Sequence, residues 1–162
     1  MASALVNDRG LAPSIDAKDV QGLVRFGYGG LKEACYLLLR IRDGAAARAW
    51  CAVAPVATAE FQEKPPDVAL QVAFTSKGLR ALGVSSQVLS GFSAEFQVGM
   101  AGEDSRSRRL GDISENAPTR WAWGRPGNEP DALVVLLAKT GLLSGWKDQV
   151  ENNAFHAAFE AL

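Results

Sequence analysis

The stretch "ACYLLLRI", Ala34 to Ile41, decides the fold. It is a short and almost continuously apolar run, the pattern of a β-strand that is covered on both faces or lies centrally in a sheet. A second run of this kind is "DALVVLLAKT", Asp131 to Thr140. The segment "VALQVAFT", Val68 to Thr75, mixes apolar and polar residues more evenly. The sequence therefore predicts two central strands and one strand nearer to an edge of the sheet.

Helical patterns separate these predicted strands. After the first strand, "RDGAAARAWCAVAP" has apolar residues at helical spacing, with Asp43 as a plausible N-terminal cap and Pro55 as the stop. Short helices follow the second strand, and Ser76 and Ser85 are plausible caps for them. A long irregular segment, residues 101–131, then precedes the third strand. A loop of this length inside a compact domain is usually functional or packs through its own side chains.

The order of the predicted elements is strand, helix, strand, helices, strand, helix. This order favours an α+β fold, a ferredoxin-like split βαβ with an antiparallel sheet of order 4-1-3-2. Helices and a long loop are inserted between strands 2 and 3. The last predicted helix runs from about Ser144 to Leu162, so the fourth strand is predicted to be missing from the chain. The first strand would then lie on an open edge, which folded proteins rarely leave unpaired. We therefore expect a partner to bind this edge strand through Ala34, Tyr36, Leu38 and Arg40.

The composition is that of an ordinary soluble protein of 162 residues, with 48% hydrophobic residues and a net charge of −1. We expect a flexible N-terminal arm at residues 1–18 and a single domain at residues 19–162. The balanced charge argues against a nucleic-acid partner. No apolar run is long enough to span a bilayer, and the N-terminus has no signal-peptide pattern. These features indicate a cytoplasmic protein without a membrane partner.

Four stretches carry a family resemblance that none of them carries alone. The first is "DVQGLVRFGYGGLKEACYLLLRIRDGAAARAW", Asp19 to Trp50, and it is followed by "VAFTSKGLRALGV", "FSAEFQVGMAGEDSRSRRLGD" and "PTRWAWG". In this order they resemble the N-terminal half of the dye-decolourising (DyP-type) haem peroxidases, in their longer variety. The resemblance covers nearly the whole chain after Lys18.

The resemblance implies two ferredoxin-like domains, with haem held in the C-terminal one. The family's distal aspartate lies in a GxxDG motif beyond the N-terminal domain, and its haem-ligand histidine and distal arginine lie further on. This chain has no GxxDG, because "RIRDG" has Arg40 where the first glycine belongs. We therefore expect no catalytic, cofactor-binding or metal-binding residue in this chain, and haem in a C-terminal half that is a second chain or a downstream segment. The two halves would form a hydrogen-peroxide-dependent oxidase of dyes and other donors, as a heterodimer if they are separate chains, and this chain alone would be inactive.

The remaining polar and aromatic candidates each have a plainer interpretation. His156 is the only histidine, and a lone helical histidine is more often structural or exposed than a haem ligand. Asp43 is expected to be a helix cap and not a catalytic acid. The arginines of the long segment could bind a phosphate or a haem propionate, but acidic neighbours favour a solvated turn; they are Arg106, Arg108 and Arg109. Trp121 and Trp123 could form a stacking or radical site for bulky dyes, although we expect them to pin the loop onto the sheet.

Two further features bear on the alternatives. "RFGYGG", Arg25 to Gly30, has neither the glycine spacing of a dinucleotide-binding loop nor the position of an RNA-binding motif, and we interpret it as a glycine-rich turn. The open edge also allows the sheet to close by pairing two copies of the chain. The alternative hypothesis is therefore a homo-oligomer, a non-enzymatic ferredoxin-like module that self-associates for binding or as a scaffold.

Overall fold

A computed structural model describes residues 15–162. Most of the predicted flexible arm at residues 1–18 therefore lies outside the described residues. In chain order the helices and strands are α1 (Leu23–Phe26), β1 (Glu33–Ile41), α2 (Gly44–Val53), β2 (Val68–Phe74), α3 (Ser76–Ala81), α4 (Ser86–Leu89), α5 (Ala94–Val98), α6 (Asp104–Leu110), the 3-10 helices η1 (Ser114–Asn116) and η2 (Pro118–Arg120), β3 (Ala132–Ala138), α7 (Leu143–Val150), α8 (Asn153–Ala158) and β4 (Phe159–Ala161). Within this part of the chain, no helix is long and apolar enough to cross a membrane.

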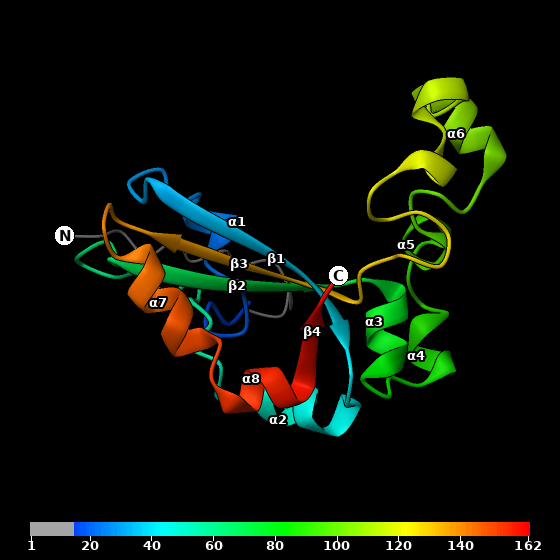
Figure 1. Cartoon of the computed structure of the whole chain (residues 1–162). Coiled ribbons are helices and arrows are strands. Elements are labelled where there is room, and N and C mark those ends of the chain that lie inside the picture. The colour runs from blue at the N-terminus through cyan, green and yellow to red at the C-terminus, as the bar shows by residue number, and fades with distance from the viewer. Residues whose placement is uncertain (1–14) are drawn as a thin grey trace, which may run out of the picture.

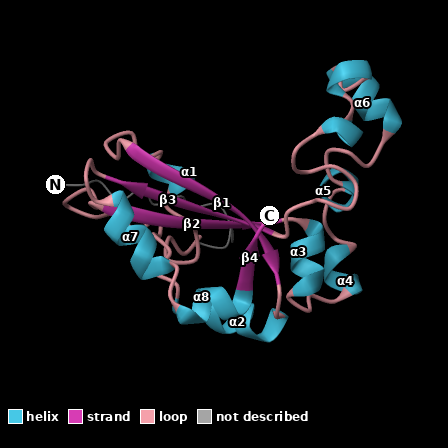
Figure 2. Ribbon diagram, viewed as in Figure 1, coloured by secondary structure: helices cyan, strands magenta, loops and turns pink. Residues whose placement is uncertain are grey.

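The strands form one four-stranded antiparallel sheet of order β2-β3-β1-β4 (Figure 2). The predicted order 4-1-3-2 and the α+β ferredoxin-like class are thereby confirmed. β1 pairs with β3 along seven positions, from Glu33 opposite Ala138 to Leu39 opposite Ala132. β2, the strand of mixed composition, lies at the edge of the sheet as predicted.

The prediction of a missing fourth strand was wrong. β4 pairs antiparallel with the end of β1, with Phe159 opposite Ile41 and Ala161 opposite Leu39. The helix predicted from Ser144 to the end is broken at Asn152, whose side-chain oxygen accepts hydrogen bonds from the Ala154 and Phe155 amides of α8. The sequence pattern misled because Phe159 continues the apolar stripe of the helix, whereas its backbone is extended and its side chain is fully buried.

The core lies between the sheet and the helices α2, α7 and α8, which cover the same face of the sheet (Figure 1). Its centre is an aromatic cluster in which the Trp50 ring meets Phe155 and Phe159 edge-on, with ring centroids 5.6 and 5.3 Å apart. Each such contact contributes roughly 0.5–1.5 kcal/mol beyond the burial of apolar area. The cluster joins α2, α8 and β4, so it holds the end of the chain against β1.

The joint between the sheet and the helices that follow β2 is made by Thr75, Gly78 and Asp131. Thr75, and not the predicted Ser76, is the cap of α3, because its hydroxyl oxygen accepts a hydrogen bond from the Gly78 amide at 3.0 Å. The Thr75 amide donates to the Asp131 carbonyl oxygen, and the Asp131 amide donates to Leu39 of β1. A Cβ atom on Gly78 would lie 1.8 Å from that same carbonyl oxygen. Glycine is therefore required where α3 crosses the start of β3.

We expect Gly78→Ala to lower the free energy of unfolding by about 1–3 kcal/mol, because the added methyl group has to displace the Asp131 backbone. The matched control is Gly145→Ala in α7, where a Cβ atom has no neighbour within 4 Å. The control should raise the free energy of unfolding by about 0.5–1 kcal/mol through helix propensity. Urea unfolding of both variants measures the difference, and equal effects of the two substitutions would contradict this account of the joint.

Candidate functional site

The outer edge of β1 is only partly covered by β4. β4 pairs with Leu39, Arg40 and Ile41, and the Leu162 amide donates to the Leu38 carbonyl oxygen at 3.0 Å. Within residues 15–162, no strand pairs with the preceding part of β1, residues 33–37, on this side. Within residues 15–162, the part of β1 without a pairing strand on this side is therefore shorter than the sequence indicated.

The backbone groups at this free edge follow from the alternation of the strand. The Leu38 carbonyl points toward β4. Backbone groups alternate along a strand, so the N–H and C=O groups of every second residue counted from Leu38 point to this side. Those of the residues in between point toward β3. Ala34 and Tyr36 thus direct both their N–H and C=O groups to the uncovered side. Their side chains lie on the face of the sheet opposite α2, α7 and α8, and Tyr36 is 65% exposed. The predicted residues Ala34, Tyr36, Leu38 and Arg40 form this one register.

Arg40 differs from the other three predicted edge residues. Its pairing position is already occupied by Glu160 of β4. Its guanidinium group donates a hydrogen bond to the Asn128 side chain, so it ties β1 to the long segment before β3. The uncovered edge therefore consists of Ala34 and Tyr36, with the amide of Leu38 at its boundary.

A groove of about 490 Å³ runs between this edge and α8. Its lining residues are Tyr36, Leu37, Leu38, Leu39, Glu151, Phe155, His156, Phe159, Glu160, Ala161 and Leu162. Phe155 and Phe159 are buried and give the groove an apolar floor, whereas His156 and Glu160 are exposed at its sides. Glu151 is ion-paired with Lys147 and raises the pKa of that ammonium through their hydrogen bond. The lining includes two carboxylates and neither Lys nor Arg.

The groove does not fit a haem. His156 is an exposed side chain of a short helix and not a group directed into an enclosed cavity. The lining has no Lys or Arg to pair with haem propionates, and the exposed carboxylate of Glu160 would repel them. Among residues 15–162, no three His, Cys, Asp or Glu side chains lie close enough to hold a metal ion.

The other predicted candidates do not converge on a common site. Asp43 is the cap of α2, as predicted, and accepts hydrogen bonds from the Ala45 and Ala46 amides at 2.7 and 3.0 Å. The three arginines of α6 share no common partner among residues 15–162. Arg106 donates to the Gly99 carbonyl oxygen and is ion-paired with Glu103. Arg109 donates to the carbonyl of its own helix and Arg108 is exposed.

The tryptophans of the long segment do not both pin it to the sheet. The Trp121 indole donates to the Asn116 carbonyl oxygen at 2.9 Å and so braces the segment internally. Trp123 is 55% exposed. The Trp121 ring therefore belongs to the local structure of the segment, and the Trp123 ring faces solvent.

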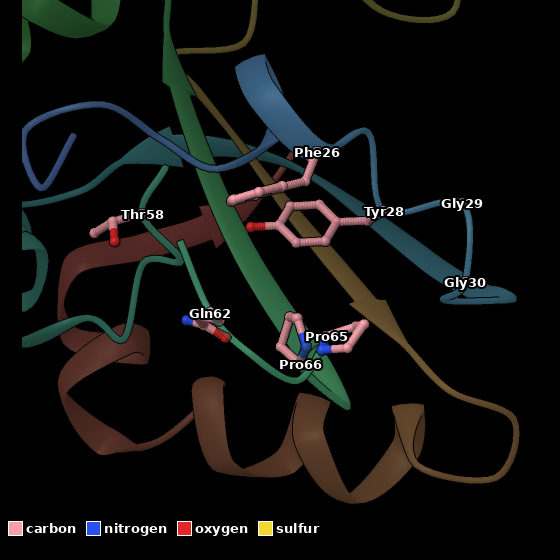
Figure 3. Close-up of a pocket in the computed structure, with 8 residues that line it drawn as sticks. All are labelled: Phe26, Tyr28, Gly29, Gly30, Thr58, Gln62, Pro65 and Pro66. Atoms are coloured by element: carbon pink, nitrogen blue, oxygen red, sulfur yellow. The ribbon is translucent and has the colours of Figure 1, made fainter. Parts of the chain in front are cut away.

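A second cavity, of about 290 Å³, lies beside the "RFGYGG" stretch (Figure 3). The Tyr28 ring lies between Phe26 and the Pro65–Pro66 pair. Its backbone is left-handed, with φ of 50°, and Gly22 leaves room for its hydroxyl, since a Cβ atom there would lie 1.9 Å away. Burial raises the pKa of the Tyr28 phenol above its ordinary value of 10.0. The turn was predicted, but the inward-facing tyrosine that makes the cavity was not.

The segment from residue 86 to residue 130 contains α4, α5, α6, η1 and η2. We call it the arm from here on; it is not the N-terminal arm predicted at residues 1–18. α5 and α6 lie beyond the end of the sheet and away from the helices of the core (Figure 1). The arm exposes seven large apolar side chains, each at least 42% accessible: Val88, Phe92, Val98, Met100, Leu110, Ile113 and Trp123. Scattered apolar residues are normal on protein surfaces, whereas contiguous apolar patches often mark interaction sites. The length of the segment was predictable from the sequence, but its projection away from the sheet was not.

Comparisons with known proteins place this fold among solved peroxidases. No family model matches the sequence, and no curated protein matches it. The structure is similar to a fungal DyP-type peroxidase from Auricularia auricula-judae, with 23% identity, a TM-score of 0.72, and coverage of 93% of this chain and 33% of that one. It is also similar to a DyP-type peroxidase from Anabaena sp., with 19% identity, a TM-score of 0.72, and coverage of 90% and 33%. The chain thus spans about a third of the length of these peroxidases, and the resemblance noted in the sequence extends to the fold.

The cap at Asp43 predicts a specific pH dependence of stability. Hydrogen bonds from the Ala46 and Ala45 amides lower the pKa of this carboxyl below its ordinary value of 3.8. A lowered folded-state pKa means that the contribution to stability is complete above the ordinary value and is lost as the pH falls below it. We expect Asp43→Asn, which keeps the cap without the charge, to lose less stability between pH 5 and pH 3 than the unsubstituted chain.

The control for this measurement is Asp43→Ala, which removes the cap at every pH. It should be less stable than Asp43→Asn already at pH 7. Urea unfolding of the three proteins at pH 7, 5 and 3 provides the comparison. A carboxyl acting as an acid catalyst, and not as a cap, would leave Asp43→Ala as stable as Asp43→Asn at pH 7.

Proposed function

We propose that this chain is the haem-free N-terminal part of a DyP-type peroxidase and that it packs against a haem-binding C-terminal part. Together the two parts would oxidise dyes or other donors, whose electrons reduce hydrogen peroxide to water. The C-terminal part would be a second polypeptide or a downstream segment of a longer one. The haem would supply the peroxide chemistry there, and this chain would supply a rigid surface and no reacting group.

One observation carries the proposal: nine-tenths of this chain superimposes on one third of solved DyP-type peroxidases. Related solved structures include a dye-decolorizing peroxidase with an engineered heme pocket and another in complex with cyanide, and this chemistry is that of those longer proteins. A chain that provides a third of such a fold lacks most of the residues that could surround a haem. The poor fit of the β1-edge groove to haem agrees with this division.

The arm supports the packing role. Its exposed apolar residues are 42–59% accessible, and removing the remaining apolar area from water contributes roughly 25 cal/mol per Å². A second protein surface is the usual cover for a patch of this kind. The arm is held to the sheet through the Thr75–Asp131 joint, where Lys77 is also ion-paired with Asp131. A partner bound to the arm would therefore have a fixed position relative to the sheet.

The sequence motifs shared with the peroxidases have structural roles in this chain. Thr75 caps α3, Gly78 allows its close approach to Asp131, and Gly83 ends it in a left-handed conformation with φ of 87°. Gly111 ends α6 in the same way, with φ of 82°. These residues position the joint and the arm, which agrees with a part whose contribution is shape and not chemistry.

Native mass spectrometry of the protein from its source cells tests the proposal. A complex of this chain with a second polypeptide and one haem would support it, and so would a longer single chain that carries haem. A haem-free multiple of this chain alone would overturn it and favour the self-associating scaffold. As a second measurement, the purified chain with haem, hydrogen peroxide and dye should show no turnover above free haem; clear turnover would also overturn the proposal.

We further expect that adding charge to the arm weakens the complex without unfolding the chain. Met100→Glu combined with Ile113→Glu places two carboxylates on the proposed interface, and burying an unpaired charge is strongly unfavourable. The dissociation constant should rise at least about tenfold, which corresponds to roughly 1.4 kcal/mol.

The control for the arm variant is Val53→Glu on α2, at a side chain that is 77% exposed and lies outside the arm. It should leave both the affinity and the melting temperature unchanged. Co-purification with the haem-binding part, followed by titration, measures the affinities. Equal loss of affinity in the control and the arm variant would show that the arm is not the interface.

A further inference from the structure

We propose that the cavity beside Tyr28 binds a small neutral aromatic molecule that carries a hydrogen-bonding group. The cavity has a volume of about 290 Å³ and is formed by residues between 26 and 66 (Figure 3). An engineered protein cavity of about 150 Å³ holds benzene, so this volume suits one ring with a polar substituent or two fused rings. The inference goes beyond the proposed function, because the site shares no residue with the arm and involves no haem.

The lining of the cavity carries no charge. Its residues are Phe26, Tyr28, Gly29, Gly30, Thr58, Gln62, Pro65 and Pro66. Two aromatic rings and two prolines offer flat apolar surfaces, against which an aromatic ligand can pack edge to face or in an offset stack. A charged ligand would lose its hydration there without gaining an opposite charge. The lining therefore favours a neutral ring over an ion.

The Tyr28 hydroxyl is the polar group that would orient such a ligand. Tyr28 is only 8% exposed. A Cβ atom on Gly22 would lie 1.9 Å from this hydroxyl and 2.7 Å from the Thr58 carbonyl oxygen, so the hydroxyl lies between the two walls of the cavity. Among residues 15–162, it takes part in no hydrogen bond. Buried polar groups are nearly always hydrogen-bonded, and a ligand with an oxygen acceptor would complete this one.

The backbone of Tyr28 gives independent support. Its φ of 50° lies in the left-handed region, which costs free energy for a residue with a Cβ atom and none for glycine. The residues on either side, Gly27 and Gly29, are glycines. Such strain is characteristic of binding and catalytic sites, where the surrounding structure holds the residue in place. The chain thus places a ring, and not a third glycine, at the cavity.

One buried side chain holds both walls of the cavity. Gln71 is 3% exposed, its Oε1 accepts a hydrogen bond from the Leu23 amide at 3.1 Å, and its Nε2 donates to the Ala57 carbonyl oxygen at 3.0 Å. The Arg25 guanidinium also crosses between the walls and donates to the Ala59 carbonyl oxygen at 2.9 Å. Leu23 and Arg25 lead into the wall that contains the tyrosine, and Ala57 and Ala59 flank the residue of the opposite wall at position 58.

The segment before the tyrosine is also fixed to the sheet. At the edge of β2, the Gln21 side chain donates to the Val72 carbonyl oxygen at 2.7 Å and accepts from the Val72 amide at 2.8 Å, which closes this edge. The Gly22 amide donates to the Ala57 carbonyl oxygen at 2.7 Å. The cavity is therefore preformed, and a preformed site binds without a large loss of conformational entropy.

Benzyl alcohol is a suitable probe, because it combines one neutral ring with a hydroxyl group. We expect it to bind the whole purified chain with a dissociation constant of about 0.1–5 mM, given its few atoms. Saturable NMR shifts of the Gly29, Gly30 and Thr58 amides measure the affinity. Contacts between the protons of the ligand ring and those of the Tyr28 ring locate the site.

Two relatives of the probe test its chemical class. Cyclohexylmethanol has a similar size and the same hydroxyl group but no aromatic ring, and it should bind at least about threefold more weakly. Benzoate has the ring and a full negative charge, and it should bind at least about tenfold more weakly because the lining offers no cation.

Variants of the chain test the role of the hydroxyl. Tyr28→Phe keeps the ring and should weaken binding of benzyl alcohol about two- to tenfold. The matched control is Tyr36→Phe, at the exposed ring of β1, which should leave the affinity unchanged. Gly22→Ala displaces the Tyr28 hydroxyl and should weaken binding at least about tenfold. NMR spectra show whether the variants are folded; if Gly22→Ala is not, the pair of Phe variants decides.

Three results would overturn the inference. The first is the absence of saturable shifts at ten times the highest expected dissociation constant. The second is an equal affinity of Tyr28→Phe and Tyr36→Phe for benzyl alcohol. The third is binding of benzoate or cyclohexylmethanol as tightly as benzyl alcohol, which would refute a neutral or an aromatic ligand, respectively. None of these results depends on the proposed packing against a haem-binding part, so the two proposals can fail separately.

Discussion

The hydrogen-bonding requirement of β1 on both of its sides is the constraint on which this structure depends. β3 satisfies one side along seven positions, and the remaining side is shared between β4 and an uncovered stretch. Buried or half-buried backbone groups must be paired, so the chain brings its last residues back across α8 to reach this strand. The aromatic contacts of Trp50 with Phe155 and Phe159 hold that return in place. The core and the groove beside β4 both lie against this second ladder.

The sequence predicted the parts of the fold that depend on local pattern. The apolar runs at Ala34 to Ile41 and Asp131 to Thr140 gave the two central strands, and Asp43 was correctly identified as a cap. β4 could not be predicted from the sequence, because Phe159 fits the apolar stripe of a helix as well as a short buried strand. The choice between the two is made by tertiary pairing with Ile41 and not by local preference.

In the candidate site, too, the local strand pattern was predictable and the tertiary contacts were not. The register of Ala34, Tyr36 and Leu38 follows from the alternation of a strand and was predictable, whereas the closure of the opposite edge by Gln21 was not. That closure joins side-chain and backbone atoms about fifty residues apart. Likewise, the exposed apolar residues of the arm have no periodicity that distinguishes them from core residues. Only the three-dimensional path of residues 86–130 leaves them uncovered.

The long separation between β1 and β3 in the chain also affects how the protein folds during synthesis. Glu33 pairs with Ala138, and about a hundred residues, including the whole arm, lie between them. At usual translation rates, roughly 5–20 s pass between the synthesis of the two strands. During that time both sides of an apolar strand lack their final partners, and the side that faces β4 waits longest. Contacts this distant in sequence also form slowly, because the intervening chain has to lose conformational entropy first. The nascent chain therefore carries an unpaired apolar strand until β3 and β4 have been made, and such a strand is prone to aggregate.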